Sequence, residues 1–215
     1  MTIIELELLS DNIAETVQFY KRVLGLDAYS LEKELVTFRV GTTKLIFRKS
    51  DNVKPVYHFA IDVPNNRFEE AYKLIKWRTE IIAAEKGDII DFTNWDAKSF
   101  YFLDNNGNIL EFITRYGNKT FSNYTFSSSS YISISEIGLV TNNVQHLADT
   151  LVKQYGLPIF HRQPRGENFT VVGDDDGLFI LGSKGRDWYP TKFRSQSFRT
   201  RVLYFHDGTL GHVVR

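Results

Sequence analysis

The chain contains no cysteine among its 215 residues. Disulfide bonds and thiolate sites are therefore excluded, and any metal ion must be held by histidine, carboxylate or backbone oxygen. An excess of charge of one sign is also lacking, because 26 basic residues balance 26 acidic residues. Proteins that bind nucleic acids usually carry a basic surplus, so the composition argues against a nucleic-acid partner.

Long apolar runs are absent as well. No uncharged stretch approaches the roughly 20 residues that a membrane-spanning helix needs. The first seven residues, Met-Thr-Ile-Ile-Glu-Leu-Glu, have neither the basic nor the apolar segment of a signal peptide. We therefore expect a cytoplasmic protein with no membrane partner, built as one or two globular domains.

The clearest local pattern is the alternation in residues 56–64, Val-Tyr-His-Phe-Ala-Ile-Asp-Val-Pro. A period of two over this length predicts a β-strand with one apolar face and one open face. An amphipathic helix is expected to follow at about 66–78 and to cover the apolar face. His58 points to the opposite face, beside the small Ala60. We interpret that open face as the wall of a cavity.

The same plan recurs along the chain. Residues 3–48 read as a strand, a helix and three strands, with Asn12 as helix cap and Gly25 as helix stop. Residues 56–114 repeat this βαβββ order. Residues 136–157 align without a gap with residues 5–26, which places Glu136 at the position of Glu5. This third unit is completed by strands near 158–161, 168–173 and 177–181, whereas a fourth unit shows one strand, near 198–205.

These repeats and their motifs resemble the vicinal oxygen chelate superfamily, which contains glyoxalases, bleomycin and fosfomycin resistance proteins and extradiol dioxygenases. The resemblance is carried by Glu5 on the first strand and by three segments, Val-Leu-Gly-Leu at 23–26, Tyr-His-Phe-Ala at 57–60 and Leu-Asp-Asn-Asn-Gly-Asn-Ile-Leu-Glu-Phe at 103–112. It implies an α+β fold in which βαβββ modules pair into cup-shaped half-barrel sheets, with helices on the convex face. We expect a glyoxalase-like domain of two modules at 1–116, a linker at 117–130, and a third module with a truncated fourth at 131–215.

The resemblance also implies a divalent metal ion in the cup, with Glu5, His58 and Glu111 as ligands and Glu111 as a catalytic group. Two carboxylates and one imidazole suit Mn²⁺, Mg²⁺ or Fe²⁺, and Zn²⁺, Ni²⁺ or Co²⁺ through the histidine. Taken singly, each of these side chains is more often a solvated or hydrogen-bonded group than a ligand.

Further polar groups are expected near the small-molecule substrate. Glu7 shares the predicted face of Glu5, and Arg39 or Lys98 is expected to hold an anionic group. The segment Gly-Arg-Asp-Trp-Tyr-Pro-Thr at 185–191 can wall a pocket, although packing against the core is the plainer interpretation. The third module carries Glu136 on an otherwise apolar set of strands, so we expect it to support structure, a homodimer contact or a metal-free pocket.

Three functions remain open from the sequence. The first is a metal-dependent lyase or isomerase acting on a small oxygenated molecule. The second is a metal-free binding or resistance protein. The third is a ring-cleaving dioxygenase, which Glu5 disfavours because the resemblance implies histidine at that position in those enzymes.

Overall fold

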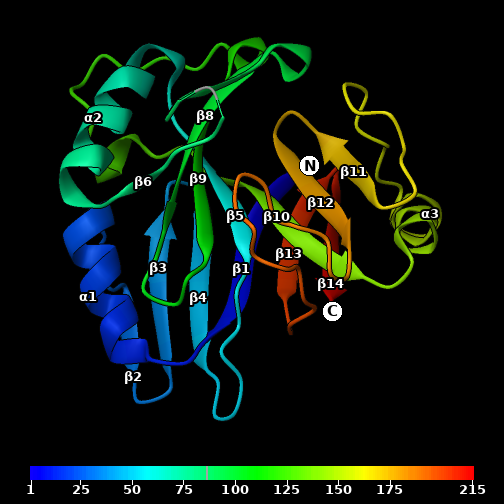
Figure 1. The fold of residues 1–215 in the computed structure, drawn as a ribbon, viewed down its shortest axis with the longest axis horizontal. Coiled ribbons are helices and arrows are strands. Elements are labelled where there is room, and N and C mark those ends of the chain that lie inside the picture. Colours follow the sequence, from blue (N-terminus) through cyan, green and yellow to red (C-terminus); the bar gives the residue numbers. More distant parts are fainter. Residues whose placement is uncertain (86) are drawn as a thin grey trace.

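The structure, a computed structural model, describes residues 1–85 and 87–215 and contains two curved sheets (Figure 1). The first sheet has the strand order β14-β13-β1-β4-β3-β2. The second has the order β11-β12-β10-β5-β9-β8-β6, and β7 pairs with β8. The strands of the first sheet are β1 (Thr2–Ser10), β2 (Ser30–Glu32), β3 (Leu35–Val40), β4 (Thr43–Lys49), β13 (Arg201–His206) and β14 (Thr209–Val214). Those of the second are β5 (His58–Asp62), β6 (Ile81–Ile82), β7 (Ile90–Phe92), β8 (Ala97–Leu103), β9 (Ile109–Arg115), β10 (Ile134–Thr141), β11 (Phe169–Asp174) and β12 (Gly177–Ser183).

Three α-helices accompany the sheets, α1 (Ile13–Leu24), α2 (Phe68–Arg78) and α3 (Val144–Tyr155). The expected cap at Asn12 is confirmed, because its side chain accepts a hydrogen bond from the Glu15 amide. Asn143 caps α3 in the same way. Gly25 and Gly156 end these helices with φ of 68° and 69°, a conformation that glycine adopts without steric cost. The α+β fold of repeated modules paired into half-barrel sheets is thus confirmed.

The modules pair in an order that the sequence does not reveal. β1 runs antiparallel to β13, so the first module shares a sheet with the truncated fourth. β5 runs antiparallel to β10, so the second module shares a sheet with the third. Residues 1–116 and residues 131–215 therefore contribute strands to both sheets. A domain division at residue 116 stays a prediction, and the sheets do not follow it.

The two inter-module seams have the same irregularity. The register shifts between Ile3 and Glu5 where β1 meets β13, and between Ile134 and Glu136 where β10 meets β5. A bulge inserts one residue into a strand and re-aims the side chains next to it. It places Glu5 and Glu136 at equivalent positions in the two sheets.

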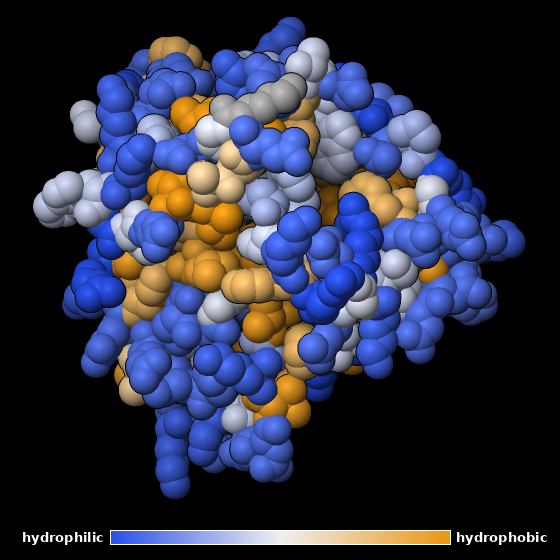
Figure 2. Space-filling model, in the orientation of Figure 1, coloured by the Kyte–Doolittle hydropathy of each residue, from blue (hydrophilic) through white to orange (hydrophobic). Residues whose placement is uncertain are grey.

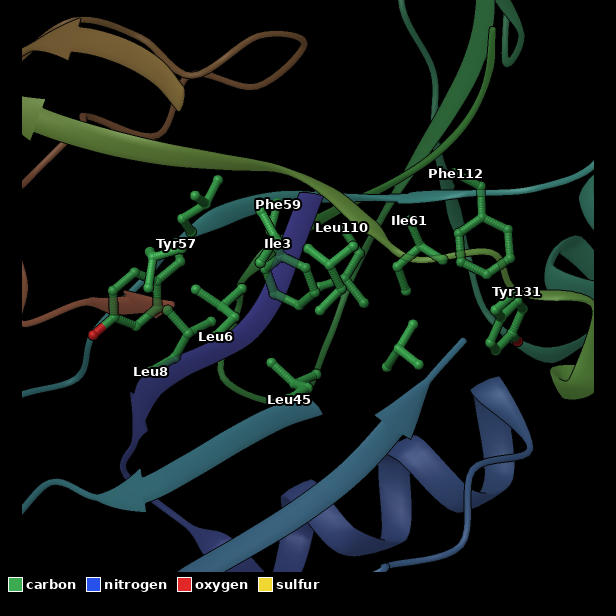
Figure 3. Packing of buried hydrophobic residues seen from close by; sticks show 14 of the residues in the cluster. Ile3, Leu6, Leu8, Leu45, Tyr57, Phe59, Ile61, Leu110, Phe112 and Tyr131 are labelled. Carbon is green, nitrogen blue, oxygen red and sulfur yellow. The ribbon is translucent and has the colours of Figure 1, made fainter. Parts of the chain in front are cut away.

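The main core lies between the sheets and the helices. Side chains of β1 point toward those of the second sheet in Figure 3, where Leu6 lies near Phe59 and Leu8 lies near Tyr57. These residues are fully or almost fully buried. Strand residues alternate between faces, so the opposite face of each sheet does not pack into this core. That face carries Glu5 in the first sheet and His58 in the second.

Four local differences from the sequence prediction are found. Ile159 makes an isolated bridge to Val172 where a strand at 158–161 is expected, and β7 is an additional short strand. Helix α2 is preceded by a 3-10 turn at Asn65–Arg67 and has no side-chain cap. Residues 117–130 hold no α-helix or strand, but hydrogen bonds join them to Asn66 and Glu70, and Phe126 is buried.

The outer surface is mixed in polarity. Figure 2 shows apolar side chains gathered toward the centre of the face in view, with hydrophilic residues around them. Within residues 1–85 and 87–215, no helix is both long and apolar enough to span a bilayer.

Candidate metal centre

Three buried side chains converge on the second sheet: His58 of β5, Glu111 of β9 and Glu136 of β10. The neighbouring strands bring them together, because Glu111 and Glu136 both stand beside Ala60 in the strand register. One donor atom from each lies within 4.8 Å of the others. His58 Nε2 is 3.6 Å from Glu111 Oε2 and 3.9 Å from Glu136 Oε2. These separations exceed hydrogen-bond length and equal or slightly exceed the roughly 3–3.6 Å between donors that lie about 2.1 Å from one ion, so a small inward shift would let the three groups share an ion.

The histidine is oriented by the backbone. Its Nδ1 lies 3.1 Å from the Ile109 carbonyl oxygen, which favours the tautomer that donates from Nδ1 and leaves the Nε2 lone pair free. Burial lowers the pKa of His58 to about 4. The imidazole is therefore neutral near pH 7, as a metal ligand must be. A carbonyl acceptor behind a ligating histidine is a common arrangement in metal sites.

The charges in this cluster do not balance. Arg115 forms ion pairs with Asp62 and with Glu136, and all three side chains are buried. Ser135 completes the network by donating to Asp62 over 2.8 Å. Asp62, Glu111 and Glu136 together carry three negative charges when ionised, whereas Arg115 supplies one positive charge and His58 none.

Glu111 is the group that this imbalance affects most. Besides its 3.6 Å approach to His58, the Glu111 carboxylate has the hydroxyls of Ser99 and Tyr101 near it, and both favour its ionised form. Burial raises the pKa of Glu111 well above its ordinary value, and the charge of Glu136 raises it further. Burial also raises the pKa of Glu136, and Arg115 opposes that rise. A divalent cation between these ligands would balance the net charge of −2, so the residues present suit such an ion.

A cavity of about 250 Å³ opens beside the cluster. Aromatic side chains form most of its wall, and its polar lining beyond the three ligands consists of Gln163 and Arg186. The aromatic residues are Phe92, Trp95, Tyr101, Phe169, Trp188 and Tyr189. The volume is below the range of about 300–1,000 Å³ usual for drug-sized ligands. The site therefore suits a small, largely planar molecule.

The loop between β12 and β13 forms one side of this cavity. Backbone hydrogen bonds between Gly185 and Ser195, and between Trp188 and Phe193, fold it into a hairpin. The Trp188 ring lies 5.5 Å from the His58 ring, centroid to centroid. The interpretation of residues 185–191 as packing against the core is thus incomplete, because this loop also walls the pocket.

The expected convergence of Glu5 with His58 and Glu111 is wrong. Glu5 lies in the first sheet, where it pairs with Arg201 and, at 3.1 Å, with Lys44. Glu5 pairs in register with Leu203, as Glu136 pairs with Ala60. Arg201 precedes Leu203 by two residues, as His58 precedes Ala60, so Arg201 occupies the position of His58 in the first sheet. The Arg201–Glu5 ion pair of the first sheet therefore stands where the second sheet has the candidate ligands His58 and Glu136.

The three expected substrate-binding residues also lie outside the cavity. Glu7 is buried in the first sheet and bonded to Arg199 at 2.5 Å and to Arg48 and Arg201. Arg39 is exposed on β3 of the same sheet. On β8, Lys98 pairs in register with Thr114 of β9, and Tyr101, three residues further along β8, pairs with Glu111. Residues that are three apart on a strand point to opposite faces. Lys98 therefore lies on the other face of the second sheet from Glu111, and it pairs with Asp91.

Sequence reasoning missed Glu136 as a member of the cluster. The signal was present, since residues 136–157 align with residues 5–26 and give Glu136 the same strand position as Glu5. The missing information was the choice of partner module for β5. Arg186 and Trp188 carry no periodic signal, because they lie on a loop.

Comparisons with known proteins agree with this architecture. No family model matches the chain. The metallothiol transferase FosB of Staphylococcus haemolyticus is 31% identical over 110 residues, which are 48% of this chain and 76% of that protein. FosB of Staphylococcus epidermidis matches with the same identity and coverage.

Solved structures share the fold at low sequence identity. A Bacillus subtilis protein described as a candidate dioxygenase superposes with a TM-score of 0.63 and 16% identity, over 100% of this chain and 84% of that one. A glyoxalase I mutant from Zea mays has a TM-score of 0.58 and 12% identity, over 90% of this chain and 71% of that one. With the fold, the repeated modules and the FosB relatives taken together, this chain belongs to the vicinal oxygen chelate superfamily.

Proposed function

We propose that the protein is a metal-dependent enzyme, a lyase or isomerase, that acts on a small oxygenated molecule in the cavity beside His58, Glu111 and Glu136. The observation that carries this proposal is the unbalanced buried charge of the cluster. Burying two carboxylates without matching cations is costly, and a divalent ion would remove that cost. Such an ion, when bound, supplies Lewis-acid polarisation of neighbouring oxygens.

The protein groups have separate roles in this proposal. Arg115 holds Glu136 in place through an ion pair, and the Ile109 carbonyl orients His58. No lysine or arginine of the described residues forms an ion pair with Glu111, so its carboxylate can take a proton from a bound molecule and return it. The aromatic walls exclude water from that transfer.

The donor set narrows the choice of metal. One imidazole and two carboxylates suit Mn²⁺, Mg²⁺ or Fe²⁺, and also Zn²⁺, Ni²⁺ or Co²⁺. Ring-cleaving dioxygenases of the two-His-one-carboxylate type need a second imidazole. At the position where that second imidazole would stand, this cluster has Glu136, which favours Lewis-acid chemistry over oxygen activation.

The test is metal content in a pair of histidine variants. His58→Ala should lower bound metal at least tenfold, as measured by elemental analysis after loading with Mn²⁺ or Zn²⁺ and gel filtration. His146→Ala is the control, because His146 is exposed on α3. Circular dichroism checks that both variants fold. Equal metal content in His58→Ala and wild type would refute the site, and a wild type that retains no metal would leave a metal-free binding protein as the better interpretation.

A further inference from the structure

Arg186 lies on the loop that walls the cavity and is the cation of its lining. Its guanidinium carbon is 4.5 Å from the centre of the Phe169 ring, so the group stacks on an aromatic face. Stacking holds the guanidinium plane while its N–H donors stay available at the edges. The cation therefore has a fixed position at the wall of the same cavity that contains the metal cluster.

This guanidinium has no anionic partner in residues 1–85 and 87–215. The adjacent carboxylate, Asp187, is already paired with Arg194 at 3.2 Å and with Lys192 at 3.7 Å. No side-chain hydrogen bond from Arg186 is found in that part of the chain. Burial lowers the pKa of Arg186, and Asp187 only partly opposes this change. A partly buried, stacked and unpaired arginine is arranged to receive an anion.

Trp188 lines the same cavity with its aromatic ring, while its indole N–H is buried behind the wall. The Trp188 Nε1–H is buried and has no hydrogen-bond partner among the described residues, although buried indole N–H groups usually have one. Trp188 is two residues from Arg186 on the same loop. Because the Nε1 atom has almost no accessible surface, the Trp188 ring serves as apolar wall, and the guanidinium of Arg186 is the donor group on this wall.

We propose that Arg186 binds an oxyanion of the substrate, so that the substrate class is a small planar carboxylate with neighbouring oxygens at its other end. This inference rests on the proposed function, in which those neighbouring oxygens meet the metal cluster. The aromatic wall accounts for the planar middle of the molecule, and the volume of about 250 Å³ limits its size. Arg186 is then the residue that selects charged over neutral molecules.

A matched pair of probes separates charge from shape. The Zn²⁺-loaded protein is titrated with 3,4-dihydroxybenzoate and with 3,4-dihydroxybenzamide, and Kd is measured by calorimetry. The two molecules share the ring and the adjacent hydroxyls and differ in charge. Wild type should prefer the carboxylate by at least about tenfold, the size of one charge-assisted hydrogen-bonded pair.

The variants assign that preference to one side chain. Arg186→Gln should reduce the preference to near onefold while leaving the Kd for the amide unchanged. Arg186→Lys should keep a smaller preference, because it retains the charge and loses the planar fork. Lys192→Gln is the control: it removes the same charge from the same loop, at a side chain that is 94% exposed, and should keep the full preference.

The outcomes distinguish the two proposals. An unchanged preference in Arg186→Gln overturns the inference about Arg186, while metal bound in the same samples leaves the proposed function standing. If no metal binds, the proposed function fails, and benzoate and benzamide are titrated against the metal-free protein. A fall in the benzoate-to-benzamide ratio in Arg186→Gln then still supports the anion site, and an unchanged ratio overturns it.

Discussion

Replacing Glu111 by Gln should stabilise the metal-free protein and at the same time remove its response to metal. The carboxylates of Glu111 and Glu136 approach within 4.8 Å. Two unit charges at that distance would repel by about 3 kcal/mol when the effective dielectric constant is about 20. Because burial and this repulsion raise the pKa of Glu111, the metal-free protein loses stability either through the repulsion or through protonation of Glu111. Glutamine has the same shape without the charge, and its amide oxygen can still accept from the hydroxyls of Ser99 and Tyr101 that lie near the carboxylate.

The expected size follows from this repulsion. Partial screening by Arg115 leaves a gain of about 1–3 kcal/mol in the free energy of unfolding, or roughly 3–9 °C in Tm for a chain of this length. In wild type, Zn²⁺ at a hundred times its Kd should add about 2.7 kcal/mol by mass action. That increment should vanish in Glu111→Gln, because a carboxylate ligand is lost.

Thermal unfolding with and without Zn²⁺ measures both effects. Glu5→Gln is the matched control, since Glu5 holds the equivalent position in the first sheet but pairs with Arg201 and Lys44. It should leave the metal increment intact and gain no stability. A lower Tm for metal-free Glu111→Gln would refute the electrostatic reasoning, and a lost metal increment in Glu5→Gln would refute the placement of the metal site.

Three further outcomes are expected. Burial favours a higher pKa for Glu7, but hydrogen bonds from Arg199 and Arg48 outweigh it and lower the pKa to about 2; the stability this gives is present above pH 4.5 and lost as pH falls toward 2. Glu7→Gln should therefore remove about 1–2 kcal/mol of acid-dependent stability, discounted because the arginines are half exposed, and urea unfolding from pH 6 to pH 2.5 checks this. In Gly138→Ala the new Cβ would lie 2.6 Å from Trp188 Cη2; we expect a cost of about 1–3 kcal/mol and altered tryptophan fluorescence, with Gly182→Ala, whose nearest ring atom is at 3.7 Å, as the milder control. Protein loaded anaerobically with Fe²⁺ and then exposed to oxygen should not cleave catechols; oxygen uptake with a yellow ring-fission product would show that the weight given to Glu136 was wrong.

Local patterns were sufficient to predict the modules. Alternation assigned each strand residue to a face, so His58 and Glu111 were correctly placed opposite the helix-covered side. Caps at Asn12 and Gly25 follow from side-chain chemistry within a few residues. Such signals act over one turn or one strand, which is why they can be recognised in a single sequence.

The choice of which modules share a sheet could not be predicted in the same way. Strands β1 and β10 have similar patterns of apolar residues, and Glu5 and Glu136 occupy the same position, so alternation alone cannot distinguish the two strands. Which strand each of them pairs with depends on contacts between residues that are far apart in the sequence. Arg201 on β13 pairs with Glu5, while Arg115 on β9 pairs with Glu136. Contacts separated by 196 and 21 residues leave no periodic trace in the sequence.

Because β1 pairs with β13 and β5 pairs with β10, the N-terminal and C-terminal halves of the chain each contribute strands to both sheets. A backbone cut within residues 117–130 would leave two pieces, each holding part of both sheets and two open strand edges. Neither piece alone contains His58, Glu111 and Glu136 together. Such pieces must find each other to complete a site, so the molecule is suited to fragment complementation and poorly suited to trimming into an independent catalytic half.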